Sequence, residues 1–275
     1  MTHSRSTGFA SIRWTALASI AAAAFVALPA TAEVCAAKSG AQTVPLIELY
    51  TSEGCNSCPP ADRWLSATIP AGGAPANAIA LAFHVDYWDR LGWKDRFASA
   101  AWTERQYAMA RANRSRQVYT PQVMVQGHDF PDWHGNAGTA ALKAVAAKPA
   151  RARIALEAEV QRGSVAVKAS GSVPAGGDRK HTALFIALTD SRLVSDVKAG
   201  ENAGVRQTHD HVFRALSGGA AASSAGEVAA NVALPIPAES GSLTTVVVFV
   251  QNTETGDVLQ ALALPIAPNA CAAAR

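Results

Sequence analysis

Two cysteines separated by two residues, Cys55-Asn56-Ser57-Cys58, lie between an apolar, β-branched run at residues 44–50 and a helix-like run at residues 61–67. Such a pair indicates either a redox site or half of a metal site. Structural zinc needs a second pair or suitably spaced histidines, but there is no second pair, and His209 and His211 are only two apart. A place between a strand and a helix N-terminus favours the redox interpretation, because the helix amides stabilise a thiolate.

The order of the two cysteines predicts their roles. Cys55 is expected to be the exposed nucleophile, with Cys58 beneath it as the thiol that resolves a mixed disulfide. Two prolines follow Cys58, and proline fits only the first helical turn. Ser57 is therefore the expected cap, which moves the helix start towards Cys58. Glu53, two residues before Cys55, would oppose thiolate formation.

A second signal is the segment Val118-Tyr119-Thr120-Pro121, which immediately precedes a strand-like run at residues 122–126. A proline after threonine, just before a sheet strand, predicts a cis peptide bond. Its backbone would then lie beside the cysteines, where an extended substrate chain docks. Thr120 and Pro121 are therefore the predicted substrate-docking residues.

The pattern of elements divides the chain near residues 148–151. Before this point strand-like and helix-like runs alternate, which is typical of a sheet with helices across its faces. The expected strands are residues 44–50, 79–85 and 122–126, and the expected helices are residues 61–67, 95–113 and 139–147.

After residue 151 the chain alternates apolar and polar residues, with no long helical pattern. The expected strands are residues 154–160, 164–170, 181–189, 211–216, 243–251 and 258–264, with a mobile loop at residues 218–226. We therefore expect an α/β domain at residues 44–148, followed by an all-β antiparallel sandwich domain at residues 151–268.

The N-terminus predicts export. Residues 1–32 combine a positive start, a 15-residue apolar run at residues 14–28 and an Ala-x-Ala end, which is typical of a secretory signal peptide. The run is shorter than the roughly 20 residues that span a bilayer; an uncleaved anchor is the alternative. No later segment suits a membrane span. The expected location is the bacterial periplasm or the cell exterior, which are oxidising compartments.

Together these features resemble the thioredoxin superfamily over residues 44–148. Longer segments are similar to a family of secreted bacterial thioredoxin-like proteins catalogued as a domain of unknown function. Those segments are residues 48–62, 83–89 and 92–95, and residues 200–202 with His209-Asp210. The resemblance covers nearly the whole mature chain and implies a thioredoxin-like fold and an exported protein. It implies less about activity, because the chemistry of that family is not settled.

A cluster of His, carboxylate and aromatic residues at 84–89 ends the second expected strand. His84 is a candidate base or copper ligand, and Asp86 a candidate to orient it. Thioredoxin-like copper carriers use two thiolates and one histidine, so Cys55, Cys58 and His84 form the candidate copper set. The alternative is a capped loop in which His84 is a satisfied strand residue and the nearby tryptophans are core.

A second polar cluster lies in the later half of the chain. It consists of Glu201, Asn202, His209, Asp210 and His211. These residues would either bind a metal or line a substrate groove, or make the turns and hydrogen bonds that fix domain packing; the packing role is the commoner one for such a segment.

Charge and motifs exclude other classes. The net charge is only +3 with no basic block, which argues against an electrostatic nucleic-acid binder. No Gly-x-Ser-x-Gly hydrolase motif and no glycine-rich phosphate loop after a strand occur.

The sequence therefore predicts thiol–disulfide exchange on periplasmic proteins, with Cys55 attacking, Cys58 resolving and no dissociable cofactor. A non-enzymatic copper-handling or protein-interaction module is the alternative, so enzymatic activity stays open. The oligomeric state is not predicted.

The other two cysteines, Cys35 and Cys271, lie near the two ends of the mature chain. Free thiols are liabilities in an oxidising compartment, and domain termini often lie close together. A Cys35–Cys271 disulfide is thus expected, with free or intermolecularly paired thiols as the alternative.

Overall fold

The computed structural model describes residues 1–3, 34–71, 78–240 and 243–266. The helices and strands that the structure describes lie between residues 34 and 265. Residues 4–33 and 267–275 lie outside the described residues, so the signal peptide and the Cys35–Cys271 bridge stay predictions. Cys35 itself is buried, and no described cysteine is a free thiol. Within the described ranges, no helix is long and apolar enough to cross a membrane.

The first half of the chain alternates strands and helices, and the three strands and three helices expected there are confirmed. The elements are β1 (Val34–Lys38), β2 (Leu46–Thr51), α1 (Pro59–Thr68), β3 (Ile79–His84), the 3-10 helix η1 (Asp86–Leu91), α2 (Ala100–Ala112), β4 (Gln122–Val125), β5 (His128–Asp129) and α3 (Gly135–Ala146). Strands β1 and β5 were not predicted.

The second half is built from strands, and the six strands expected there are confirmed. The elements are β6 (Arg153–Gln161), β7 (Ser164–Ser172), the 3-10 turn η2 (Gly177–Arg179), β8 (Thr182–Asp190), β9 (Leu193–Asp196), β10 (Arg206–His209), β11 (Val212–Ala221), β12 (Glu227–Pro235), β13 (Thr244–Asn252) and β14 (Val258–Pro265).

The prediction of a loop beginning at Gly218 was wrong, because β11 continues to Ala221. Gly218 is small for a packing reason. A Cβ on Gly218 would lie only 2.3 Å from Cδ1 of Phe185 on the neighbouring strand. Strands β9, β10 and β12 were also missed.

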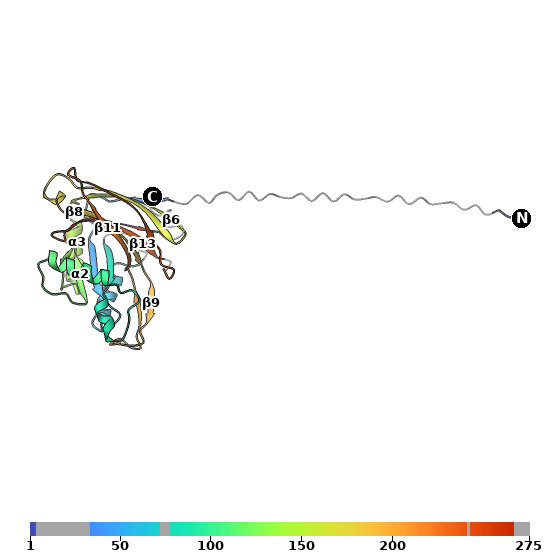
Figure 1. The fold of residues 1–275 in the computed structure, drawn as a ribbon, viewed down its shortest axis with the longest axis horizontal. Coiled ribbons are helices and arrows are strands. Elements are labelled where there is room, and N and C mark those ends of the chain that lie inside the picture. The colour runs from blue at the N-terminus through green and yellow to red at the C-terminus, as the bar shows by residue number, and fades with distance from the viewer. Residues whose placement is uncertain (4–33, 72–77, 241–242, 267–275) are drawn as a thin grey trace. The chain divides into compact units, whose positions relative to one another are not determined.

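Two large sheets contain these strands except β9 and β10, which pair with each other in a separate antiparallel sheet (Figure 1). One has four strands in the order β1-β6-β7-β12, and the other has eight in the order β14-β13-β8-β11-β3-β2-β4-β5. Strand β3 pairs in parallel with β2 and also with β11, where Val212 lies opposite Ala82. The eight-stranded sheet thus takes strands from both segments that were assigned to separate domains, and the predicted boundary near residue 148 does not separate two sheets.

Alternation along the strands divides the apolar side chains into distinct cores. The two large sheets share one core, in which Leu156 and Val167 meet Ile186 and Val248. At the other end of the eight-stranded sheet, one face of β2, β3 and β4 packs against α1 and α3. The opposite face packs with residues of α2 and the later strands. The described chain is therefore a mixed α/β protein in which strands predominate.

A buried ion pair fixes α2 to the sheet. Both carboxylate oxygens of Glu48 on β2 accept hydrogen bonds from Arg105 on α2, at 3.0 and 2.7 Å. The Arg105 guanidinium also faces the rings of Phe83 and Phe249. Glu48 belongs to residues 48–62, the first segment that resembles the family, and its role in the structure is therefore in packing.

Candidate functional site

The Cys55–Cys58 segment lies where β2 ends and α1 begins. Cys58 is the N-cap of α1, and Pro59 occupies the first helical turn. The carbonyl of Cys58 accepts the amides of Ala61 and Asp62, at 2.9 and 3.2 Å. The expected shift of the helix start towards Cys58 is confirmed, although the capping position belongs to Cys58 and not to Ser57.

The two cysteines form a disulfide, with an S–S distance of 2.14 Å and a Cα–Cα distance of 5.4 Å. Both residues are 0% exposed. The prediction of an exposed Cys55 was therefore wrong. The cause is tertiary, because residues distant in sequence close around the pair.

The first of these residues comes from the segment before β4. Thr120 Oγ1 donates to Cys55 Sγ at 3.4 Å and accepts the indole N–H of Trp88, on η1, at 2.8 Å. The Thr120–Pro121 peptide bond is cis, as predicted. Ser57 Oγ is also 3.4 Å from Cys55 Sγ. Two hydroxyl groups therefore adjoin the first sulfur.

The second covering segment comes from the later half of the chain. It is the β9–β10 loop, residues 198–204, whose ends are joined by hydrogen bonds between Val197 and the residues Gly204 and Val205. From this loop, the buried Asn202 donates to the carbonyls of Glu53 and Cys55, at 2.8 and 3.0 Å.

Beside it in the β9–β10 loop, Glu201 accepts the backbone N–H of Asn56 at 3.2 Å. Residues 200–202, singled out in the sequence for either packing or a groove, thus lie directly on the Cys-x-x-Cys segment.

A buried acid lies two residues before Cys55. Glu53 is 0% exposed, and its carboxylate accepts the indole N–H of Trp93 at 2.7 Å. Its other oxygen lies 3.4 Å from His209 Nε2, and neither of these two atoms completes a hydrogen bond with described residues. Burial alone would raise the pKa of Glu53. His209 and the hydrogen bonds that the Glu53 carboxylate accepts outweigh burial, so this pKa is lowered.

His84 forms a buried pair with Asp95. His84 Nδ1 is 2.6 Å from Asp95 Oδ2, and the same carboxylate accepts the amides of Glu53 and Phe97, each at 2.9 Å. Burial opposes both charges, yet the pairing prevails: Asp95 raises the pKa of His84, and His84 lowers the pKa of Asp95. His84 Nε2 is left without a hydrogen-bond partner among described residues.

The expectation that Asp86 orients His84 was wrong. Asp86 begins η1, where its Oδ1 accepts the hydroxyl of Thr103 at 2.6 Å. The orienting carboxylate is Asp95, which sequence reasoning missed as a site residue. It lies within the family-like segment 92–95 together with Trp93, so that segment was the available signal.

The remaining predicted residues have structural partners. Asp210 accepts the amide of Arg192 at 2.9 Å, and His211 Nε2 is 2.7 Å from the carbonyl of Ile69. In the part of the chain that the structure describes, no group of three or more His, Cys, Asp or Glu side chains is placed to hold a metal ion. The candidate copper set of Cys55, Cys58 and His84 stays a prediction.

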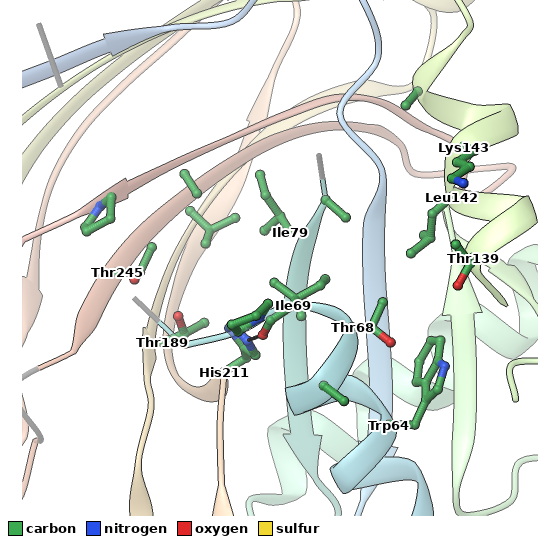
Figure 2. Close-up of a pocket in the computed structure, with 18 of the residues that line it drawn as sticks. Trp64, Thr68, Ile69, Ile79, Thr139, Leu142, Lys143, Thr189, His211 and Thr245 are labelled. Carbon is green, nitrogen blue, oxygen red and sulfur yellow. Dashed lines mark hydrogen bonds between the residues drawn. The ribbon is translucent and has the colours of Figure 1, made fainter. Parts of the chain in front are cut away.

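A cavity of about 1090 Å³ lies apart from the disulfide, between α1, α3 and the later strands (Figure 2). Ile79, Leu142 and His211 are among its lining residues, whereas neither Cys55 nor Cys58 is among those described. Burial lowers the pKa of His211, one of these lining residues.

Comparison with known proteins defines the family. Residues 46–251 match the family described as "Protein of unknown function (DUF1223)", and the chain belongs to that family. No curated protein matches.

Two solved structures are similar. One is protein AGR_C_4864 from Agrobacterium tumefaciens, with a TM-score of 0.58 and 25% identity over 82% of this chain and 95% of that one. The other is HBP35 of Porphyromonas gingivalis, with a TM-score of 0.61 and 13% identity over 82% of this chain and 75% of that one. The second likeness concerns the fold alone.

Proposed function

We propose that this protein exchanges thiols and disulfides with other proteins through Cys55 and Cys58, on a thioredoxin-like α/β scaffold. The observation that carries the proposal is the disulfide between the end of β2 and the N-cap of α1, with Thr120 Oγ1 3.4 Å from Cys55 Sγ. The order β2-α1-β3-α2-β4 around it supports the scaffold. The four-stranded sheet and the strands β8, β13 and β14 that share its core would form the sandwich part.

The exchange balances without a resident cofactor. A substrate thiolate attacks Cys55 Sγ, the Cys55–Cys58 bond breaks, and Cys58 leaves as a thiolate that takes a proton from solvent. A second substrate thiolate then attacks the substrate sulfur of the mixed disulfide and releases Cys55. The substrate is oxidised to a disulfide and the cysteine pair is reduced; the reverse sequence reduces a substrate disulfide. Thr120 and Pro121 would dock the substrate backbone beside Cys55.

The proposed location is the periplasm or the cell exterior, and the proposed substrates are protein thiols or disulfides there. The predicted signal peptide supports this location. An oxidised cysteine pair is also consistent with it, because disulfides persist in oxidising compartments.

A second candidate is a protein-interaction module in which the disulfide is only structural. Burial favours it, since both cysteines are 0% exposed and reactive cysteines are usually partly exposed. Under this alternative the pair would brace the turn between β2 and α1 and would not exchange.

An exchange assay separates the two candidates. Reduction of insulin by dithiothreitol, followed by turbidity, should be faster with the wild-type protein. The Cys55→Ser variant should return the rate to the uncatalysed value because it removes the attacked sulfur. A variant of an exposed residue away from the site, Glu157→Gln on β6, should keep the wild-type rate. A wild-type rate equal to the uncatalysed one would contradict the proposed function.

A further inference from the structure

The β9–β10 loop contacts the Cys-x-x-Cys segment through two neighbouring residues of unlike character. Asn202 is buried, and its single amide nitrogen donates to two carbonyls, those of Glu53 and Cys55. Glu201 is exposed, and its carboxylate accepts one backbone N–H, that of Asn56. The first contact is shielded from water, whereas the second competes with water. The two contacts should therefore differ in how readily they open.

The contact made by Glu201 has a particular place in the site. Asn56 lies in sequence between Cys55, whose sulfur is attacked, and Ser57. The Oγ of Ser57 is 3.4 Å from that sulfur. A reagent that reaches Cys55 must approach through segments that leave both cysteines 0% exposed. Because the Asn56 amide is tied to the loop, opening of this contact frees the backbone next to the attacked sulfur.

We propose that the β9–β10 loop controls access to the disulfide, with Glu201 as the contact that an incoming thiol displaces and Asn202 as the residue that positions the Cys55 backbone. Backbone hydrogen bonds of Val197 with Gly204 and Val205 hold the base of the loop. Gly200 and Gly204 have φ values of +73° and +84°, which let the chain turn sharply. Its significance for substrates rests on the proposed function, but its effect on the disulfide does not.

The test is the rate at which dithiothreitol reduces Cys55–Cys58, followed by alkylation and mass analysis of the peptide that contains both cysteines. Two electrons pass from the dithiol to the protein disulfide, and the dithiol becomes a cyclic disulfide. Wild-type protein should react more slowly than a synthetic oxidised peptide of residues 54–59, which has the same ring and no loop. A protein rate equal to the peptide rate would overturn the proposal.

Three variants assign the effect. Glu201→Ala should speed reduction about threefold to tenfold, because loss of one hydrogen bond raises the open population. Glu201→Gln keeps an oxygen acceptor and should fall between Glu201→Ala and wild type. Glu157→Gln removes an exposed carboxylate on β6 and should leave the rate unchanged.

Positioning by Asn202 is tested with Asn202→Asp, which sets a carboxylate against two carbonyl oxygens and should speed reduction more than Glu201→Ala does. Near-ultraviolet circular dichroism checks that each variant is folded. If Asn202→Asp does not fold, the Glu201 pair still decides the question. A folded Glu201→Ala protein that reacts at the wild-type rate overturns the role of the loop, whatever the insulin assay shows.

Discussion

Replacing Cys58 with serine is expected to convert the protein into a trap that holds partner proteins as mixed disulfides through Cys55. The wild-type pair is closed as a disulfide, and in the proposed reaction Cys58 is the thiol that releases a bound partner. Without it, Cys55 can form a mixed disulfide that no internal thiol resolves. Non-reducing gels of cells that express the variant, followed by mass spectrometry of the bands that dithiothreitol removes, measure the trapping.

The matched control is Cys55→Ser, which keeps Cys58 and removes the sulfur proposed to attack. This variant should trap nothing. Cys58 lies at the helix cap, whereas Cys55 has Thr120 and Ser57 beside its sulfur. Equal trapping by the two variants would contradict the assignment of roles.

Replacing Asp95 with asparagine is expected to lower the free energy of unfolding by about 3–5 kcal/mol, because it leaves one partner of a buried pair behind. The Asp95 carboxylate is fully buried and accepts hydrogen bonds from His84, Glu53 and Phe97. Urea unfolding at pH 5.5 measures the loss. Asp196→Asn removes a carboxylate from an exposed ion pair and should change the free energy by no more than about 1 kcal/mol.

The loss at Asp95 should depend on pH in a defined direction. The pKa of His84 is raised above its ordinary 6.5, so its stabilisation is complete below that value and is lost as pH rises through the raised pKa. The pKa of Asp95 is lowered below 3.8, so its stabilisation is complete above 3.8 and is lost as pH falls through the lowered pKa. The difference in the free energy of unfolding between wild type and Asp95→Asn should be largest between pH 3.8 and pH 6.5 and smaller at pH 9. A constant difference would contradict the pairing.

Patterns of neighbouring residues predicted those parts of the site that depend on local sequence. The prolines after Cys58 placed the helix start, and Thr120-Pro121 marked the segment that adjoins Cys55. Burial of Cys55 was not predictable in this way. The residue that bonds its carbonyl, Asn202, is 147 positions away in sequence, and such contacts depend on the tertiary fold.

The partner of His84 shows the same limit at shorter range. Asp86 is two residues from His84 and would share its face if β3 continued. The strand ends at His84, and η1 begins at Asp86 and turns that side chain to Thr103. Asp95, 11 residues away, is the carboxylate that contacts His84 instead.

The sheet topology was also beyond local patterns. Most strands were visible from alternation and β-branched runs, but the parallel pairing of β11 with β3 joins Val212 to Ala82 across a long stretch of chain. The β9–β10 loop lies shortly before β11 in sequence and contacts the Cys-x-x-Cys segment through Glu201. Pairing partners depend on which apolar faces meet, and many strands of this chain have similar faces.

The reduction potential of Cys55–Cys58 tests the central claim most directly. It is measured by equilibrating the protein with glutathione buffers and quantifying the peptide that contains both cysteines, which separates this pair from Cys35. An exchange site should have a potential above about −300 mV, within the range over which cellular dithiols pass electrons. A value well below about −300 mV is typical of a structural disulfide and would contradict thiol–disulfide exchange at this site.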